Sequence, residues 1–101
     1  MNKVKNACKN SKNVRVLPLD LEDYSDFSLK VLQAISFFNT IDILFNNAGI
    51  SQRSLAKETL IRVDKRIMDI NYFGTVALTK ELLPYFIEKN MGHFVIITSI
   101  V

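Results

Sequence analysis

The chain has 101 residues, of which 49% are hydrophobic, and a formal net charge of +3, so it can form one small domain with an apolar core. Lysine and arginine are scattered from Lys3 to Lys89 without a run, which argues against nucleic-acid binding. The single cysteine excludes an internal disulfide. No apolar stretch reaches the ~18 residues that a membrane span needs. The polar N-terminus does not resemble a signal peptide, so the localisation is left open.

The first third of the chain predicts one strand and one helix. Residues 1–13 are rich in lysine and asparagine and fit either the end of a helix or a frayed terminus. Residues 14–19 are apolar and β-branched, which predicts a short strand of the buried type. Pro18 places that strand at a sheet edge, or near its own end, because proline cannot donate to a ladder. From Asp23 to about Asn39, apolar residues recur every three or four positions, which predicts a helix with Asp23 as its N-cap.

The remainder of the chain predicts two more strands around a long helix. Residues 41–45 and 94–98 have the composition of buried strands, and residues 50–58 predict a polar loop. The helix is predicted from about Thr59 to Lys89, as the longest element. Pro84 is expected to bend or interrupt its last turns.

This long helix carries apolar residues on two faces. The first face comprises Val63, Ile67, Ile70, Gly74 and Leu78, and the second comprises Met68, Tyr72, Val76 and Leu83. A helix of this kind lies deep in a core or contacts a partner. The second face is therefore a candidate homo-oligomer interface.

The order strand–helix–strand–helix–strand predicts an α/β fold with a parallel sheet of about three strands. In open parallel sheets, ligands bind outside the carboxyl ends of the strands. Polar residues follow all three predicted strands: Asp20, Asn46-Asn47 and Thr98-Ser99. These positions indicate a site, although strand ends also meet turns, where such residues are common for structural reasons alone.

Four blocks, in this order and spacing, resemble the short-chain dehydrogenase/reductase family. The blocks are Leu17–Leu21, Ile41–Gly49 with its Asn-Asn-Ala-Gly, Asn71–Thr75 and Gly92–Ser99. Residues 49–55 and 71–84 further resemble the dehydrogenase/reductase member seven group, whose complete members are often membrane-associated. The resemblance implies a doubly wound, Rossmann-like sheet. It also implies NAD or NADP as cofactor, and hydride transfer to or from a small carbonyl or alcohol substrate.

By the same resemblance, five residues would bind the cofactor: Asp20, Leu21, Asn46, Ala48 and Gly49. Asp20 would accept a hydrogen bond from the adenine amino group, for which a carboxylate is a suitable acceptor. Asn46, Ala48 and Gly49 would line the adenosine side, where a glycine lets the chain pass close to a ligand. Asn47 would stabilise the sheet through side-chain hydrogen bonds.

Two residues would have catalytic roles if the resemblance holds. The backbone carbonyl of Asn71 would hold a water in a proton relay, although a simple structural hydrogen bond also explains an asparagine inside a helix. Ser99, in preference to Thr98, would bind the substrate carbonyl and orient a catalytic tyrosine. A metal site is not expected, because the one histidine, His93, has no cysteine or carboxylate neighbour.

The sequence also departs from the family pattern. It contains no Gly-rich phosphate loop, and no Tyr-x-x-x-Lys follows Ser99. Tyr85 and Lys89 have that spacing but precede the serine, so we interpret the match as coincidental. We therefore expect residues 1–101 to be the central portion of an NAD(P)-binding domain, inactive alone. The alternative is a non-catalytic interaction or dimerisation module that uses helix 59–89.

The family's strand order raises a structural question. In the order 3-2-1-4-5-6, residues 14–19 correspond to strand three and residues 41–45 to strand four, with strands one and two between them. The two segments are therefore expected either to pair directly through a right-handed crossover or to leave open edges.

Overall fold

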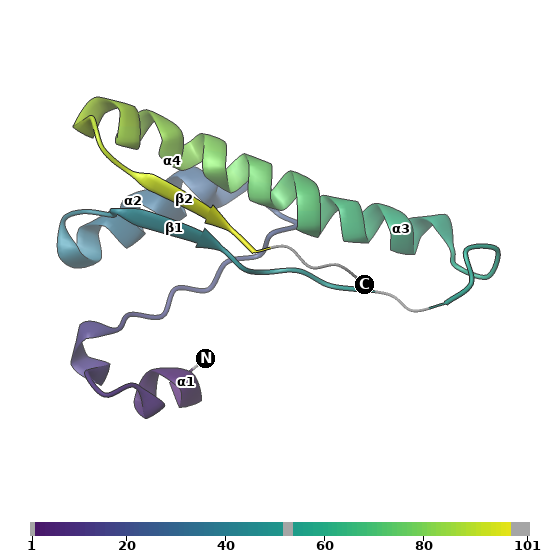
Figure 1. The fold of residues 1–101 in the computed structure, drawn as a ribbon, viewed down its shortest axis with the longest axis horizontal. Helices are drawn as coiled ribbons and strands as arrows, with labels where there is room; N and C mark the ends of the chain where they lie inside the picture. The colour runs from purple at the N-terminus through teal and green to yellow at the C-terminus, as the bar shows by residue number, and fades with distance from the viewer. Residues whose placement is uncertain (1, 52–53, 98–101) are drawn as a thin grey trace.

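The structure is a computed structural model that describes residues 2–51 and 54–97. Its elements, in chain order, are α1 (Asn2–Ala7), a 3₁₀ turn (Ser11–Asn13), a 3₁₀ turn (Tyr24–Asp26), α2 (Phe27–Phe38), β1 (Ile43–Asn46), α3 (Ile61–Met68), a π-helical turn (Asp69–Gly74), α4 (Thr75–Lys89) and β2 (His93–Ile96). Helices α2 and α4 pack on one face of a small sheet (Figure 1). The predicted Thr98 and Ser99 lie outside the described residues.

The sheet consists of β1 and β2, which pair in parallel with Ile43 opposite His93 and Asn46 opposite Ile96. Two further backbone bonds extend the ladder, from His93 N–H to the Asp42 carbonyl (3.1 Å) and from Ile97 N–H to the Asn46 carbonyl (3.0 Å). Parallel strands need a crossover connection, and the long helix provides it. The predicted α/β arrangement with a parallel sheet is confirmed.

Residues 14–19 do not form the predicted strand, so the described sheet has two strands where about three were expected. Direct pairing with residues 41–45 does not occur. A cleft of about 720 Å³ lies between the two segments, lined by Leu17, Leu19, Leu44 and Phe45 among others. The composition suits a strand, but within the described residues no strand lies beside it to complete a ladder.

Helix α2 begins as predicted. The Asp23 carboxylate accepts hydrogen bonds from Ser25 N–H (3.1 Å) and from the Ser25 hydroxyl (2.6 Å), and these bonds lower the pKa of Asp23. The first turn, Tyr24–Asp26, is 3₁₀, and the helix ends where Asn39 adopts a left-handed conformation with φ 67°. The expected helix from Asp23 to Asn39 is therefore confirmed.

The long helix runs without a break from Ile61 to Lys89 through α3, the π-helical turn and α4. Leu60 precedes it in an extended conformation, so it begins two residues after the predicted Thr59. Of the two expected effects of Pro84, a bend or an interruption, the interruption does not occur. Pro84 lies on the exposed side, where the carbonyl that lacks its helical donor can bond to water.

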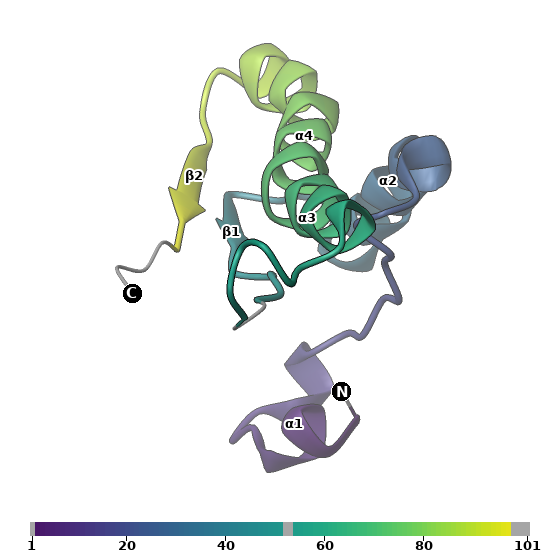
Figure 2. The same cartoon turned by 90° about the vertical axis from the view of Figure 1, so that its right-hand side faces the viewer.

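The core is small and lies between α2, α4 and the sheet. Val31, Leu82 and Phe86 are buried together, and Leu44 and Phe94 of the two strands pack against them. Side chains on the opposite sheet face are exposed, with Ile43 at 51% and Phe45 at 62%. The α1 segment lies apart from α2–α4 (Figures 1 and 2). The radius of gyration of 15.9 Å exceeds the roughly 13 Å expected for a compact domain of this length.

Candidate functional site

The candidate site forms where β1 ends and the chain passes the π-helical turn. The side chain of Asn71 makes two hydrogen bonds to the backbone of Ile50. Its Oδ1 accepts from Ile50 N–H (2.8 Å), and its Nδ2 donates to the Ile50 carbonyl (2.7 Å). We call this pair of bonds the Asn71–Ile50 clasp. It joins the loop after β1 to the long helix across 21 residues of sequence.

Gly49 lies against this clasp. A Cβ atom at Gly49 would come within 3.1 Å of Asn71 Oδ1, which is tighter than ordinary van der Waals contact. The backbone of Gly49 has no positive φ, so the requirement for glycine here is one of space. A cavity of about 470 Å³ opens beside it. The lining residues include Asn46, Asn47, Ala48, Gly49, Asn71 and Thr75.

Asn46 is the buried polar residue of the sheet. Its side chain is 8% exposed, and its Nδ2 donates to Thr79 Oγ1 on α4 at 3.4 Å. Asn47 is exposed, whereas the Asn46 side chain ties β1 to α4. Alternation along an extended segment explains the difference, because neighbouring side chains point to opposite faces.

Asp20 and Leu21 lie in the turn between residues 14–19 and α2. The Asp20 carboxylate accepts from Glu22 N–H (2.9 Å) in an Asx-type turn and remains exposed. Leu21 lines the 720 Å³ cleft together with Asn46 and Ala48. The structure therefore places Leu21 on a cleft with two other predicted cofactor residues, and it does not bring Asp20 into the cavity that Asn71 lines.

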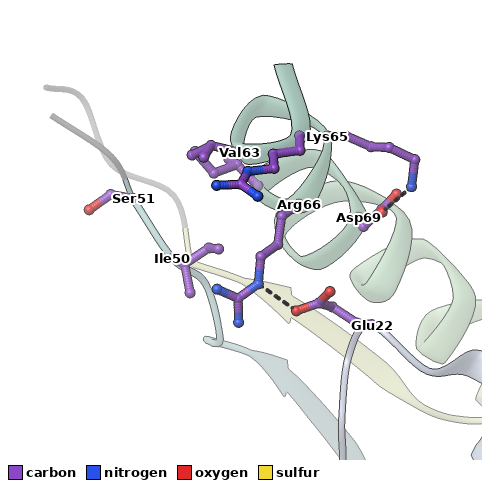
Figure 3. Close-up of a pocket in the computed structure, with 9 residues that line it drawn as sticks. Glu22, Ile50, Ser51, Val63, Lys65, Arg66 and Asp69 are labelled. Carbon is purple, nitrogen blue, oxygen red and sulfur yellow. Dashed lines mark hydrogen bonds and ion pairs between the residues drawn. The ribbon is translucent and has the colours of Figure 1, made fainter. Parts of the chain in front are cut away.

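Three polar contacts were not foreseen from the sequence, two between residues 22–24 and the long helix and one within that helix. Arg66 Nε bonds to Glu22 Oε1 at 2.7 Å, and Lys65 Nζ bonds to Asp69 Oδ2 at 2.6 Å (Figure 3). The Tyr24 hydroxyl donates to the Asp69 carbonyl at 2.7 Å. Only the Lys65–Asp69 pair carries a sequence signal, its i,i+4 spacing on a helix. The other contacts join residues more than 40 positions apart, and no local pattern indicates them.

The two ion pairs border a hollow of about 660 Å³ that Ile50 and Ser51 line from the opposite side (Figure 3). The carboxylate partners raise the pKa of Lys65 and Arg66. Desolvation, followed by the nearby Asp69 charge, raises the pKa of Tyr24. The tyrosine is thus protonated at neutral pH and available as a hydrogen-bond donor.

Sequence comparison identifies the family. A profile described as short chain dehydrogenase matches residues 1–101. The chain belongs to the short-chain dehydrogenase family. It is 45% identical over 85 residues to the mouse protein named dehydrogenase/reductase SDR family member 7B, and 41% identical over 97 residues to the human protein named member 7. These alignments cover 84% and 96% of the chain but only 26% and 29% of the relatives. The resemblance expected from the four sequence blocks is confirmed.

Solved structures support the same assignment. The chain superposes on ElxO with NADP bound with a TM-score of 0.87, at 25% identity over 97% of this chain and 40% of that one. For serine dehydrogenase from Escherichia coli the TM-score is 0.83, also at 25% identity, with 97% and 44% coverage. The short-chain dehydrogenase chain thus has part of a Rossmann-like fold, the fold of NAD(P)-dependent oxidoreductases.

The pair Tyr85 and Lys89 lies at the opposite end of the sheet from the cavity. Lys89 Nζ donates to Thr40 Oγ1 (2.6 Å), the Ile41 carbonyl (2.7 Å) and Asp42 Oδ1 (2.7 Å), all just before β1 begins. The Lys89 hydrogen bond lowers the pKa of Asp42. Lys89 therefore anchors the start of β1 to the end of α4, in agreement with the interpretation of Tyr85 and Lys89 as a coincidental match.

Within residues 2–51 and 54–97, no three histidine, cysteine or acidic side chains are grouped as a metal site would require. None of the helices in that same part of the chain combines the length and apolar composition needed to cross a membrane.

Proposed function

We propose that this chain forms part of the cofactor-binding and proton-relay region of an NAD(P)-dependent oxidoreductase. The reaction is hydride transfer between the nicotinamide and a small carbonyl or alcohol substrate. The observation that carries the proposal is the cavity at the end of β1, which Asn46, Ala48, Gly49 and Asn71 line together. Family membership and the NADP named in the ElxO structure support the choice of cofactor.

The residues present fit the adenosine side of such a cofactor. The Asp20 carboxylate is exposed, and only one of its oxygens is used in the turn, which leaves an acceptor for an exocyclic amine. Gly49 adds no side chain beside the cavity, so a ligand can approach the backbone there. The bound nicotinamide would supply the hydride. Leu21, Asn46 and Ala48 would complete the binding surface.

The role we propose for Asn71 is carried by its backbone. Both polar atoms of its side chain are already bonded to Ile50, so the side chain has no free group to offer a substrate. Asn71 lies in the π-helical turn, where backbone pairing shifts from four residues to five. Such turns are frequent at functional sites. The Asn71 carbonyl would hold a water that passes protons to the site.

Ser99 is the proposed partner of the substrate oxygen. A hydroxyl at the carboxyl end of a central strand can reach a carbonyl held at that edge of the sheet. Thr98 would point to the opposite face. The catalytic tyrosine that Ser99 would orient is not in this sequence, and neither is a Gly-rich phosphate loop. We therefore expect this chain alone to bind NADH or NADPH weakly or not at all. Calorimetric titration that found micromolar binding would contradict that expectation.

The test of the proposed function begins with the transcript. Codons for a Gly-rich loop upstream and a Tyr-x-x-x-Lys downstream would establish that a longer oxidoreductase contains this chain. In that protein, Ser99→Ala should lower turnover about 100-fold or more, the usual range for loss of an acid–base contribution. Thr98→Ala is the matched control and should change turnover much less. A transcript without those codons, or inactivity of the Thr98→Ala protein alone, would overturn the assignment.

A second candidate function, homo-oligomerisation, rests on a separate observation. Of the second apolar face of the long helix, Met68 is 49% exposed, Tyr72 is 52% exposed and Leu83 is 40% exposed. Exposed apolar residues gathered on one face usually mark an interaction site. This surface would pack against the same helix of a second copy, whether or not the assembled protein is catalytic.

A further inference from the structure

The π-helical turn that carries Asn71 is contacted at both ends by one short segment, residues 21–24. At the start of the turn, the Tyr24 hydroxyl donates a 2.7 Å hydrogen bond to the Asp69 carbonyl. At its end, Gly74 lies against Leu21. A Cβ atom on Gly74 would stand 2.7 Å from the Leu21 carbonyl oxygen and 2.9 Å from the Leu21 Cβ. Asn71 lies between these two contacts.

We propose that Tyr24 is a positioning residue that maintains this turn in its π-helical register and thereby places Asn71. The catalytic consequence of this placement rests on the proposed function, in which the Asn71 carbonyl holds a relay water. The placement itself does not, because it concerns only the hydrogen bonds of the Asn71–Ile50 clasp.

The physical basis is the hydrogen bonding of the Asp69 carbonyl. A carbonyl oxygen has two lone pairs, so it can accept the Tyr24 hydroxyl in addition to a backbone N–H. π-helical turns are rare because α-helical pairing is normally preferred. A donor outside the helix that bonds at the start of the turn favours the wider geometry. Gly74 contributes at the other end, since only a residue without a side chain allows Leu21 to approach so closely.

A change of register would displace Asn71. Adding or removing one residue of helical pairing rotates the following residues by about 100° around the helix axis. That rotation would carry the Asn71 side chain away from Ile50 and break both bonds of the clasp. The Tyr24 ring is held independently of its hydroxyl, because it packs against Phe27 with ring centroids 5.6 Å apart.

Tyr24→Phe is therefore a precise test, because it retains the ring and removes only the donor. The matched control is Arg66→Gln, which breaks the ion pair to Glu22. That pair also joins the 21–24 segment to the helix, but it does not touch the Asp69 carbonyl, and exposed pairs of this kind contribute little to stability. Asn71→Ala is the positive control, because it removes the clasp directly.

The measurement is amide hydrogen exchange, residue by residue, in the complete protein translated from the gene, without substrate. The reporter is the Ile50 N–H, which donates to Asn71 Oδ1. In Tyr24→Phe we expect it to exchange about fivefold to tenfold faster, the factor that corresponds to one lost hydrogen bond. Amides 70–74 should change with it, and Arg66→Gln should resemble wild type. Unchanged Ile50 exchange in Tyr24→Phe would overturn the proposal.

Kinetics on the same variants separate the positioning role of Tyr24 from the relay role of Asn71. If Asn71 acts in a relay, Tyr24→Phe should lower kcat and alter its pH profile while cofactor affinity stays at the wild-type value. Faster Ile50 exchange with unchanged kcat would uphold the positioning role of Tyr24 and contradict the relay of the proposed function. A lower kcat with unchanged exchange would overturn the positioning role.

Discussion

The two halves of the long helix differ in what holds them. The core half, Thr75–Lys89, buries Leu82 (2% exposed) and Phe86 (5% exposed) against α2 and the sheet. The site half, Ile61–Gly74, extends past the carboxyl ends of the strands (Figure 1). It buries Ile70 and Gly74, and polar contacts also tie it to neighbouring loops. Apolar packing thus places the helix on the sheet. Hydrogen bonds and an irregular turn shape the end that reaches the candidate site.

This division predicts that substitutions in the two halves have different consequences. Changes to buried side chains in the core half should lower the free energy of unfolding. Changes to exposed side chains in the site half should leave stability largely intact and alter the site instead.

The largest effect is expected for Phe86→Ala. Phe86 is 5% exposed and contacts the Phe94 ring, with centroids 5.0 Å apart. Truncation of such a buried ring should lower the free energy of unfolding by about 3–5 kcal/mol, measured by urea denaturation. Phe73→Ala is the control in the site half, where the side chain is 48% exposed, and it should cost about 0.5 kcal/mol or less. Equal losses for the two variants would contradict the division.

Gly92→Ala tests the packing of the core half at the residue that lies against the Phe86 ring. A Cβ atom on Gly92 would overlap the Phe86 ring, so the ring or the turn before β2 must shift. Overpacking of this kind typically costs about 1–3 kcal/mol, again measured by urea denaturation. The control is Met91→Ala, because Met91 is 61% exposed. A Gly92→Ala protein as stable as the Met91→Ala protein would show that the contact is easily relieved.

The sequence could predict the helices of the fold but not all of its strands. The 3.6-residue periodicity indicated both helices, and Asp23 correctly marked the start of the first one. The second helix ends at Lys89 as predicted, and Asn90 after it adopts φ 57°. The β-branched composition of residues 14–19 predicted a strand that the structure lacks. Strand formation depends on a neighbouring strand, and a local pattern does not contain that information.

The candidate site was likewise only partly predictable from the sequence. The Asn-Asn-Ala-Gly block indicated the cavity at the end of β1, and Asn46, Ala48 and Gly49 do line it. An asparagine inside a helix indicated a structural hydrogen bond at Asn71, but not that Ile50 is its partner. The π-helical turn and the Tyr24–Asp69 bond had no sequence signal. Long-range contacts and shifts of helical backbone pairing do not produce a periodic pattern in the sequence.

The exposed apolar face of the long helix gives a prediction about assembly. Val76→Asp combined with Leu83→Asp should reduce self-association or aggregation, because it places charge on the proposed homo-oligomer surface. Leu83 is 40% exposed, so the change should not remove core packing there. Sedimentation velocity provides the measurement, with Lys80→Asp, at an exposed charged position of the same helix, as the control. Unchanged sedimentation of the double variant would count against the interface.

The smallest effect is expected from pH. Lys89 lowers the pKa of Asp42 in the folded protein, so the unfolded chain binds a proton more readily than the folded one. The contribution of this pair to stability is therefore present above the ordinary aspartate pKa of about 3.9 and is lost as the pH falls below it. Asp42→Asn should remove that part of the pH dependence in melting experiments between neutral and acidic pH. Because Asp42 is largely exposed, the effect should be far smaller than that of Phe86→Ala.

The central claim is that the site half presents Asn71 to a nucleotide held beyond β1. A crystal structure of the complete gene product with NADP bound tests it most directly. We expect the Asp20 carboxylate within hydrogen-bond distance of the adenine amino group, Gly49 against the adenosine, and an ordered water on the Asn71 carbonyl. A nucleotide bound elsewhere, or an Asn71 carbonyl paired within regular α-helix, would contradict the account.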